Sequence, residues 1–266
     1  MKINIVGGNG LMGRMHKSAF EMAGHEVIIS GRHTNLTPEA AARKSDITII
    51  SVPISKTEEI IKKVAPYCKA IMDFTSLKIF PINAMLNYSS GKCEVGGLHP
   101  LYGEVDSIRG RTIIYCPTER SGDRCNEIID CLKLAGAKIK EMDPEKHDLL
   151  VAGISQSARL NLLEGFALLV EESGIDLNEL YEISPPPTKI LINLLARQVD
   201  ESKDILYKEL RDNNPFVSGI DEILASSIKH LREQKNLPER IRKLFGSELV
   251  SYQKKAKKII EENKKA

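Results

Sequence analysis

The sequence predicts an α/β protein in which a Rossmann-type doubly wound sheet is followed by an all-helical domain. Three observations lead to this prediction. Short apolar runs alternate with helical stretches through residues 1–142, a glycine motif directly follows the first run, and helical patterns fill residues 143–266. Alternating strands and helices are typical of a mainly parallel sheet with helices on both faces. We therefore predict two domains that meet after residue 142.

Seven short runs in the first domain are predicted to be strands. Most of them are continuously apolar, as expected for strands that are buried on both faces of a parallel sheet. Four stretches between them, residues 11–24, 56–66, 80–89 and 124–136, have apolar residues at helical spacing. The predicted strands are residues 2–6, 26–30, 46–51, 69–74, 93–98, 111–116 and 137–142.

The second domain begins at Asp143, a good N-cap, with Pro144 in the first helical position. The helix that follows is apolar nearly all round, so it should be buried on every side. A helical domain of this size buries such a helix most easily against a second copy, which predicts a homodimer. Later helices are expected to break at residues 173–178, 184–187, 212–216 and 236–240.

Composition argues against several classes of protein. The formal net charge of +2, the absence of tryptophan and the lack of a basic, aromatic-rich stretch give no case for nucleic-acid binding. The five cysteines form no CxxC pair, so neither a disulfide framework nor a metal site is expected. A strand begins at Lys2 and no apolar run is long enough to span a bilayer. These features predict a cytoplasmic protein with no signal peptide and no membrane contact.

The motif "GGNGLMG" predicts a dinucleotide site. Gly8, Gly10 and Gly13 form the pattern GxGxxG directly after the first strand and at the start of a helix. Glycines permit a tight turn and a close approach of the backbone to a ligand. The helix N-terminus, with Leu11 and Met12, offers amide protons and a positive dipole end to a pyrophosphate.

The end of the second strand bears on the choice between NAD and NADP. An NAD site usually has an aspartate or glutamate here, whereas this chain has Ser30, Arg32 and His33. A guanidinium can bind a 2′-phosphate through two hydrogen bonds, so NADP is favoured over NAD. The alternative for Arg32 is a solvated loop residue. Val52 and Pro53 end the third strand and are expected beside the nicotinamide end of the cofactor.

The stretch "GGLHPLYG" places His99 between a glycine pair and a proline. The glycines let backbones come close, and the proline stops the strand from continuing. The imidazole is therefore expected at the mouth of a site, although a histidine in such a loop can also be structural. His147, at the start of the long helix, is interpreted as structural.

Four stretches in order, "GGNGLMG", "SVPI", "DFTSLK" and "GLHPLYG", resemble the prephenate dehydrogenases and the related arogenate dehydrogenases. The likeness continues through "EKHDLLVAG" and "SPPPTKILINLLARQV" and fades in the C-terminal helices. The resemblance implies a helical dimerisation domain and an active site in the cleft between the domains. It also implies oxidative decarboxylation of prephenate to 4-hydroxyphenylpyruvate and CO2, with hydride transfer to NAD(P), in tyrosine biosynthesis.

The resemblance implies roles for particular residues. The family's catalytic histidine corresponds to His99, which would accept the hydrogen of the substrate's C4 hydroxyl. Its active-site serine corresponds to Ser76, which would hydrogen-bond both His99 and the substrate. The family arginine that binds a substrate carboxylate corresponds to Arg197. Many members have histidines at the positions of Gln156 and Arg159, and Arg159 could itself hold a carboxylate here.

Lys189, Asn193 and Arg197 recur every four residues and so share one face of an otherwise apolar helix. Such a stripe is often the solvent side of a helix. A cationic stripe would also suit a substrate with two negative charges, and Lys189 is therefore a second candidate for binding the substrate.

Other functions remain open on the sequence. Arogenate has the same reacting ring as prephenate, so an arogenate dehydrogenase that gives tyrosine directly is one alternative. Another is an NADP-dependent dehydrogenase of a different small acid, but such enzymes often use a lysine in the first long interdomain helix, and residues 153–166 contain none. A non-enzymatic NADP-binding regulator would be expected to have lost His99 or Ser76, and this chain has both.

Overall fold

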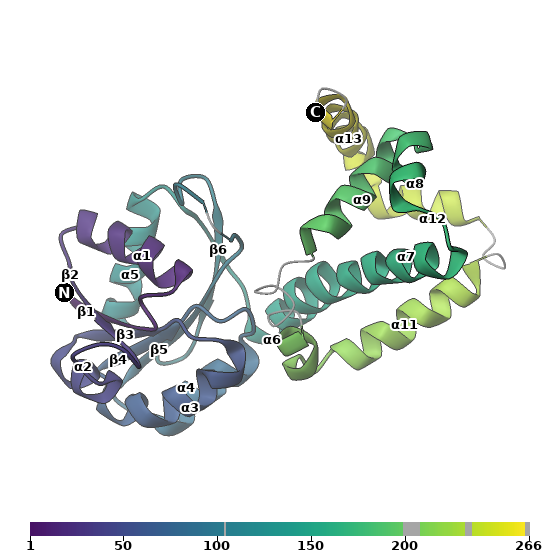
Figure 1. The fold of residues 1–266 in the computed structure, drawn as a ribbon. Coiled ribbons are helices and arrows are strands. Elements are labelled where there is room, and N and C mark those ends of the chain that lie inside the picture. Colours follow the sequence, from purple (N-terminus) through teal and green to yellow (C-terminus); the bar gives the residue numbers. More distant parts are fainter. Residues whose placement is uncertain (104, 199–207, 232–235, 264–266) are drawn as a thin grey trace. The chain divides into compact units, whose positions relative to one another are not determined.

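The computed structural model describes residues 1–103, 105–198, 208–231 and 236–263, which form two compact units. The first unit contains Met1–Gly153 together with Lys208–Pro215, and the second contains Ile154–Tyr207 and Phe216–Ala266. The predicted fold class is confirmed, because the first unit is a sheet covered by helices and the second is helical (Figure 1). None of the helices in these described ranges is both long and apolar enough to cross a lipid bilayer.

The first unit is built on one seven-stranded sheet, and each strand overlaps a predicted run. The strands are β1 (Lys2–Val6), β2 (Glu26–Ser30), β3 (Ile47–Ile50), β4 (Ala70–Asp73), β5 (Glu94–Pro100), β6 (Thr112–Pro117) and β7 (Lys138–Glu141). Their spatial order is β2-β1-β3-β4-β5-β6-β7. The first five strands are parallel to one another, β6 pairs antiparallel with β5, and β7 is parallel to β6.

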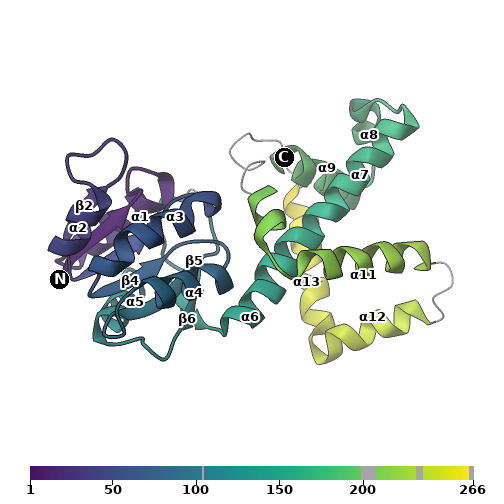
Figure 2. The ribbon, with the colours of Figure 1, turned by 90° about the horizontal axis from the view of Figure 1, so that it is seen from below.

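Helices cover both faces of this sheet (Figures 1 and 2). One face carries α1 (Leu11–Met22) and α5 (Asp123–Leu134). The other carries α2 (Pro38–Lys44), α3 (Ile54–Val64) and α4 (Ile79–Tyr88). Crossovers on both faces are the consequence of joining parallel strands through helices, as in other doubly wound folds.

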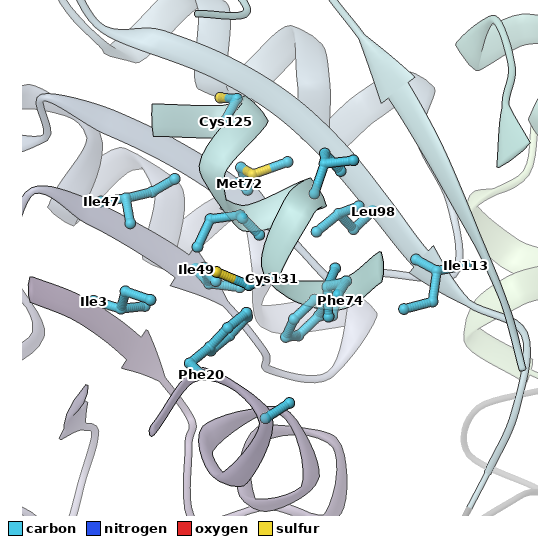
Figure 3. Packing of buried hydrophobic residues seen from close by; sticks show 14 of the residues in the cluster. Ile3, Phe20, Ile47, Ile49, Met72, Phe74, Leu98, Ile113, Cys125 and Cys131 are labelled. Carbon is cyan, nitrogen blue, oxygen red and sulfur yellow. The ribbon is translucent and has the colours of Figure 1, made fainter. Parts of the chain in front are cut away.

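Alternate residues of the central strands belong to two separate cores. In β3, Ile49 joins the core under α1 and α5, whereas Ile50 joins the core under α3 and α4. Figure 3 shows the first core, where Phe20 of α1 lies near the side chains of the central strands and close to Cys131 of α5. Complete burial of one isoleucine side chain stabilises the fold by about 1.5–3 kcal/mol. Burial on both faces explains why these strands are continuously apolar in the sequence.

The chain leaves β7 through α6 (Pro144–His147), which stays with the first unit. The side chain of Asp143 caps this helix, as predicted, and accepts hydrogen bonds from two backbone amides of the first turn. A π-helical stretch, η2 (Asp148–Ala158), follows directly. Wide turns of this kind are rare and frequently occur at functional sites.

The break predicted at residues 236–240 is wrong, because residues 237–240 begin a helix, with Pro238 in its first turn, where proline is tolerated. The helices of the second unit are separated at the other predicted breaks. They are α7 (Arg159–Ser173), α8 (Leu177–Ile183), α9 (Pro186–Gln198), α11 (Val217–Lys229), α12 (Leu237–Phe245) and α13 (Leu249–Asn263). Gly174 ends α7 in the left-handed conformation, and Asp176 caps α8. Within this unit α9 contacts both α7 and α13. The burial predicted for every side of the long helix is not reached in the single chain, because Leu162, Leu168 and Leu169 of α7 are exposed.

Candidate active site

The carboxyl ends of the parallel strands meet at one edge of the sheet. The backbone amide of Gly7, after β1, donates to the carbonyl of Ser30 at 2.8 Å. The amide of Ser51, after β3, donates to the carbonyl of Val6 at 2.9 Å, and Phe74, after β4, donates to the end of β3 at 2.9 Å. These bonds hold the turns after four neighbouring strands side by side. Ligands of open α/β sheets bind at this edge.

The turn between β1 and α1 fits a pyrophosphate. Gly7 has a φ of +82°, and a Cβ atom there would lie 2.2 Å from the carbonyl oxygen of Ser51. A Cβ on Gly13 would lie 2.4 Å from the Cα of Gly8, so only glycine allows this packing. Gly10 is the N-cap of α1, and neither a capping side chain nor an acidic residue occupies the first turn. The first amides of the helix, including those of Leu11 and Met12, are therefore available to an anion.

The other predicted cofactor residues differ in their burial and in their contacts with this turn. Val52 lies beside it, because a Cβ on Gly7 would approach the side chain of Val52 to 3.0 Å. Pro53 is exposed and is the N-cap residue of α3. Arg32 and His33 are exposed in the loop after β2. Ser30 is buried, and its hydroxyl donates to Oδ1 of Asn4 at 2.8 Å. Its side chain therefore stabilises the sheet. Only the backbone carbonyl of Ser30 contacts the glycine turn, through the amide of Gly7.

His99 lies near the carboxyl end of β5, where its side chain is buried except for 3% of the residue surface. Its Nδ1 lies 2.8 Å from Nε2 of His147, a residue of α6. The two rings meet edge to face, with their centroids 5.0 Å apart. Nδ1 of His147 in turn donates to Oδ1 of Asp148 at 2.7 Å. Among the described residues nothing hydrogen-bonds Nε2 of His99, so this nitrogen is available to a ligand.

Asp148 is fixed by the first turn of α4. Its two carboxylate oxygens accept hydrogen bonds from the backbone amides of Lys78, at 2.7 Å, and Ile79, at 2.9 Å. The side chain of Lys78 is fully buried, pairs with the carboxylate of Asp73 and donates to the carbonyl of Leu98 at 2.8 Å. Leu98 directly precedes His99, so this ion pair also holds the end of β5.

Burial makes the neutral form of both histidines dominant at neutral pH. Burial lowers the pKa of His99 well below its ordinary value, and the neighbouring His147 and Lys78 lower it further. Burial also lowers the pKa of His147, although Asp148 opposes this effect. The pKa of Asp73 is raised by burial, against the influence of Lys78. A neutral imidazole with one open nitrogen can accept a proton from a hydroxyl group.

The sequence predicted a hydrogen bond between Ser76 and His99. In the structure the side chain that hydrogen-bonds His99 is His147. Ser76 is half-buried after β4, and no hydrogen bond joins it to His99 in the parts of the chain that the structure describes. The network of His147, Asp148 and Lys78 was missed. Its signals were present, because both "KHD" and "SLK" lie inside the stretches that carry the family resemblance.

The predicted substrate-binding residues all lie in the second unit. Arg159 begins α7, is half-buried, and donates from Nε to the carbonyl of Ser155 at 3.4 Å. Lys189 of α9 lies 5.0 Å from the centre of the Tyr181 ring, which is a cation–π distance. Arg197 is exposed near the end of α9. Their roles toward a substrate stay predictions.

Comparisons with known proteins also find the prephenate and arogenate dehydrogenases. Residues 18–141 match the family model described as "Prephenate dehydrogenase, nucleotide-binding domain". A probable arogenate/prephenate dehydrogenase of Methanocaldococcus jannaschii is 29% identical over 254 residues, which cover 88% of this chain and 56% of that protein. The T-protein of Haemophilus influenzae is 26% identical over 226 residues, covering 84% of this chain and 59% of that protein. The chain thus spans less than two thirds of the length of these relatives.

A solved structure shares the fold over almost the whole length. The crystal structure of prephenate dehydrogenase from A. aeolicus, in complex with hydroxyphenyl propionate and NAD+, superposes with a TM-score of 0.70. The superposition covers 98% of each chain at 20% sequence identity. At this identity the likeness concerns the fold.

Proposed function

We propose that this chain is a prephenate dehydrogenase, which catalyses the NAD(P)-dependent oxidative decarboxylation of prephenate. The match of residues 18–141 to the family's nucleotide-binding domain and the likeness to the relatives above support this proposal. The products would be 4-hydroxyphenylpyruvate, CO2 and the reduced cofactor. The observation that supports this most directly is the neutral, buried His99, whose Nε2 is open at the same sheet edge as the glycine turn. Enzymes that act on prephenate and on arogenate belong to the same family and use the same class of cofactor. The choice of prephenate as the substrate is our proposal.

The chemistry requires few catalytic groups. A nicotinamide cofactor, when bound, would supply the acceptor for the hydride that leaves C4 of the substrate ring. Nε2 of His99 takes the hydrogen of the C4 hydroxyl as that carbon becomes ketone-like. The bond from C1 to the ring carboxylate then breaks, its electrons complete the aromatic ring, and the proton returns from His99 to the phenolate oxygen. Positioned general-base catalysis of this kind contributes about 10²–10⁴-fold in rate.

The residues around the glycine turn would hold the cofactor. The amides at the start of α1, including those of Leu11 and Met12, would bind the pyrophosphate, and Val52 and Pro53 would border the nicotinamide end. We further propose that NADP is preferred over NAD. Arg32 is exposed in the loop after β2, where an NAD site usually has a carboxylate. A guanidinium there can bind the 2′-phosphate.

The substrate's negative charges need cationic partners. We propose that Arg197 binds one carboxylate, with Arg159 and Lys189 as further candidates, because these side chains are cationic and lie on the contacting helices α7 and α9. Ser76, half-buried after β4, is proposed to contact the substrate rather than to fix the ring of His99.

The helical unit supports a homodimer. Its exposed apolar side chains exceed what isolated surface residues explain, and burying them against a second copy is the simplest remedy. They include Leu162, Leu168, Leu169, Ile175, Ile183, Ile223, Ile228, Leu231, Leu244, Val250 and Ile259. We propose that α7 lies at the centre of this interface.

The proposal is tested with purified protein by crossing prephenate and arogenate with NAD+ and NADP+. Reduced nicotinamide absorbance is recorded for all four pairs. We expect the highest kcat/KM with prephenate and NADP+. A higher value with arogenate would assign the enzyme to the amino acid substrate. No reduction in any pair would contradict the dehydrogenase and favour a cofactor-binding regulator.

A further inference from the structure

We propose that His147 and Asp148 are positioning residues that hold His99 in a single tautomer, with the proton on Nδ1 and the lone pair of Nε2 facing the substrate. The inference rests on the proposed function, because it concerns how the base of that reaction is prepared. It follows from the chain of hydrogen bonds that leads from the start of α4 to β5.

The chain of hydrogen bonds begins at the carboxylate of Asp148, which can only accept hydrogen bonds. Oδ1 of Asp148 receives the amide of Lys78, and Oδ2 receives the amide of Ile79. These two amides belong to the N-terminal turn of α4, where an anion is stabilised by unpaired N–H groups and the helix dipole. Asp148 is therefore held as a carboxylate, and Nδ1 of His147, 2.7 Å away, must carry a hydrogen.

The direction of the next bond is then determined. His147 is completely buried, and its neutral form has only one N–H group. Because that N–H is at Nδ1, Nε2 of His147 carries a lone pair and can only accept. The contact of 2.8 Å between this atom and Nδ1 of His99 is a hydrogen bond only if Nδ1 of His99 donates. The single N–H of neutral His99 is then at Nδ1, and Nε2 is bare.

This tautomer is the one that the reaction needs. A bare Nε2 can take a hydroxyl proton, whereas the other tautomer would present an N–H to the substrate and could not act as a base. Once His99 is protonated, its charge is stabilised through His147 by the carboxylate of Asp148. A carboxylate behind a catalytic histidine has this effect in other enzymes, where it fixes the tautomer and stabilises the imidazolium.

A structural role alone would explain part of the network, because Asp148 also caps α4 and links it to α6. The two roles differ in what they require of position 147. Stability requires a side chain that fills the space, whereas the tautomer requires an acceptor atom at the place of Nε2. A glutamine carbonyl can reach this place, but a leucine offers no acceptor.

The first test reads the tautomer without reference to activity. The full chain is labelled with 15N-histidine, and two-bond 15N–1H correlation spectra are recorded at pH 7.5, with His99→Asn and His147→Leu used for assignment. We expect a protonated Nδ1 and a bare Nε2 on His99. A bare Nδ1 with a protonated Nε2 would overturn the inference, whichever substrate the enzyme uses.

The second test compares His147→Leu with His147→Gln. We expect kcat to fall about 100-fold in the leucine variant and to stay within about 10-fold of wild type in the glutamine variant. The KM for the cofactor should be unchanged in both, and the spectra of the leucine variant should show mixed tautomers at His99. His230→Leu is the matched control, because His230 is half-buried at the end of α11 and its Nδ1 hydrogen-bonds the carbonyl of Ser226 in the same helix.

Two results would contradict the inference. One is a folded leucine variant, by its melting temperature and circular dichroism, with wild-type kcat. The other is a glutamine variant that loses as much kcat as the leucine variant while remaining folded. If the wild-type protein oxidises neither prephenate nor arogenate, the proposed function fails, and the 15N spectra alone then decide the tautomer.

Discussion

The two units of the molecule differ in how far they bury their apolar side chains. In the sheet unit, Ile3, Ile49 and Leu98 are completely buried by helices of the same chain. In the helical unit, Leu162, Leu168 and Leu169 are 53%, 58% and 66% exposed. The sheet unit thus buries these side chains within one chain, whereas those of α7 stay exposed in the single chain. We propose that a second copy covers them.

The units also differ in where they hold ionisable groups. The sheet unit buries three histidines, His16, His99 and His147, together with the ion pair of Lys78 and Asp73. The helical unit contains a single histidine, His230, which is half-buried at the end of α11. Under the proposed function, base chemistry and acid sensitivity belong to the sheet unit, whereas dimer assembly and binding of the substrate's charges belong to the helical unit.

The largest expected effect tests whether the chemistry depends on the sheet unit. We predict that His99→Asn lowers kcat by about 10²–10⁴-fold, because asparagine cannot act as a base at neutral pH. Binding of the cofactor should change little, since the glycine turn is intact, and the variant should assemble as the wild type does. Turnover is measured by nicotinamide absorbance and cofactor binding by calorimetry. Wild-type kcat would contradict the role of His99.

The second effect concerns acid sensitivity. Burial lowers the pKa of His16 from 6.5 to about 4. The unfolded chain therefore binds a proton at a higher pH than the folded chain, so stability is complete above pH 6.5 and is lost as the pH falls toward 4. We predict a loss of about 3 kcal/mol from this group between pH 7 and 4. The lowered pKa values of His99 and His147 act in the same direction.

This dependence is measured by urea unfolding across the pH range, with His16→Gln as the comparison. The glutamine side chain does not titrate, so the slope of stability against pH should become shallower by the contribution of His16. An unchanged slope in the variant would show that the acid sensitivity comes from elsewhere.

The third effect concerns assembly. We predict that Leu169→Glu weakens the homodimer at least tenfold, which corresponds to about 1.4 kcal/mol, because it places a charge in the proposed apolar interface. Leu134→Glu is the matched control: Leu134 is 76% exposed but belongs to α5 of the sheet unit. Sedimentation velocity over a concentration series measures both. If both substitutions weakened the dimer equally, the proposal that the interface lies on the helical unit would be contradicted.

The smallest effect is on cofactor choice. We predict that Arg32→Ala weakens NADP+ binding about tenfold, the size expected for loss of a charge-assisted hydrogen bond, and NAD+ binding much less. Calorimetric titration of each cofactor tests this directly. Equal losses for the two cofactors would show that Arg32 does not read the 2′-phosphate.

Much of the sheet unit was predictable because its signals are local. The seven strand-like runs, the glycine turn after the first run and the helix that Asp143 and Pro144 begin after the last each depend on a few consecutive residues. The division of domains after residue 142 stays a prediction, although α6 and Asp148 stay with the sheet unit through the amides of Lys78 and Ile79.

The candidate site was predictable only in part. His99 stood out through its neighbours in sequence, but its partner did not, because Nδ1 of His99 meets a residue that is 48 positions away. The resemblance placed Ser76 in that position instead. The inward orientation of Ser30 was also beyond sequence reasoning, since it depends on the parallel register that sets β2 beside Asn4 of β1.

In the proposed reaction, hydride transfer and decarboxylation are coupled. The most direct measurement incubates the purified chain with prephenate and NADP+, and quantifies CO2 and NADPH from the same sample. We predict one molecule of CO2 for each NADPH, with 4-hydroxyphenylpyruvate as the organic product. Formation of NADPH without CO2, or of CO2 without NADPH, would contradict the coupled oxidative decarboxylation.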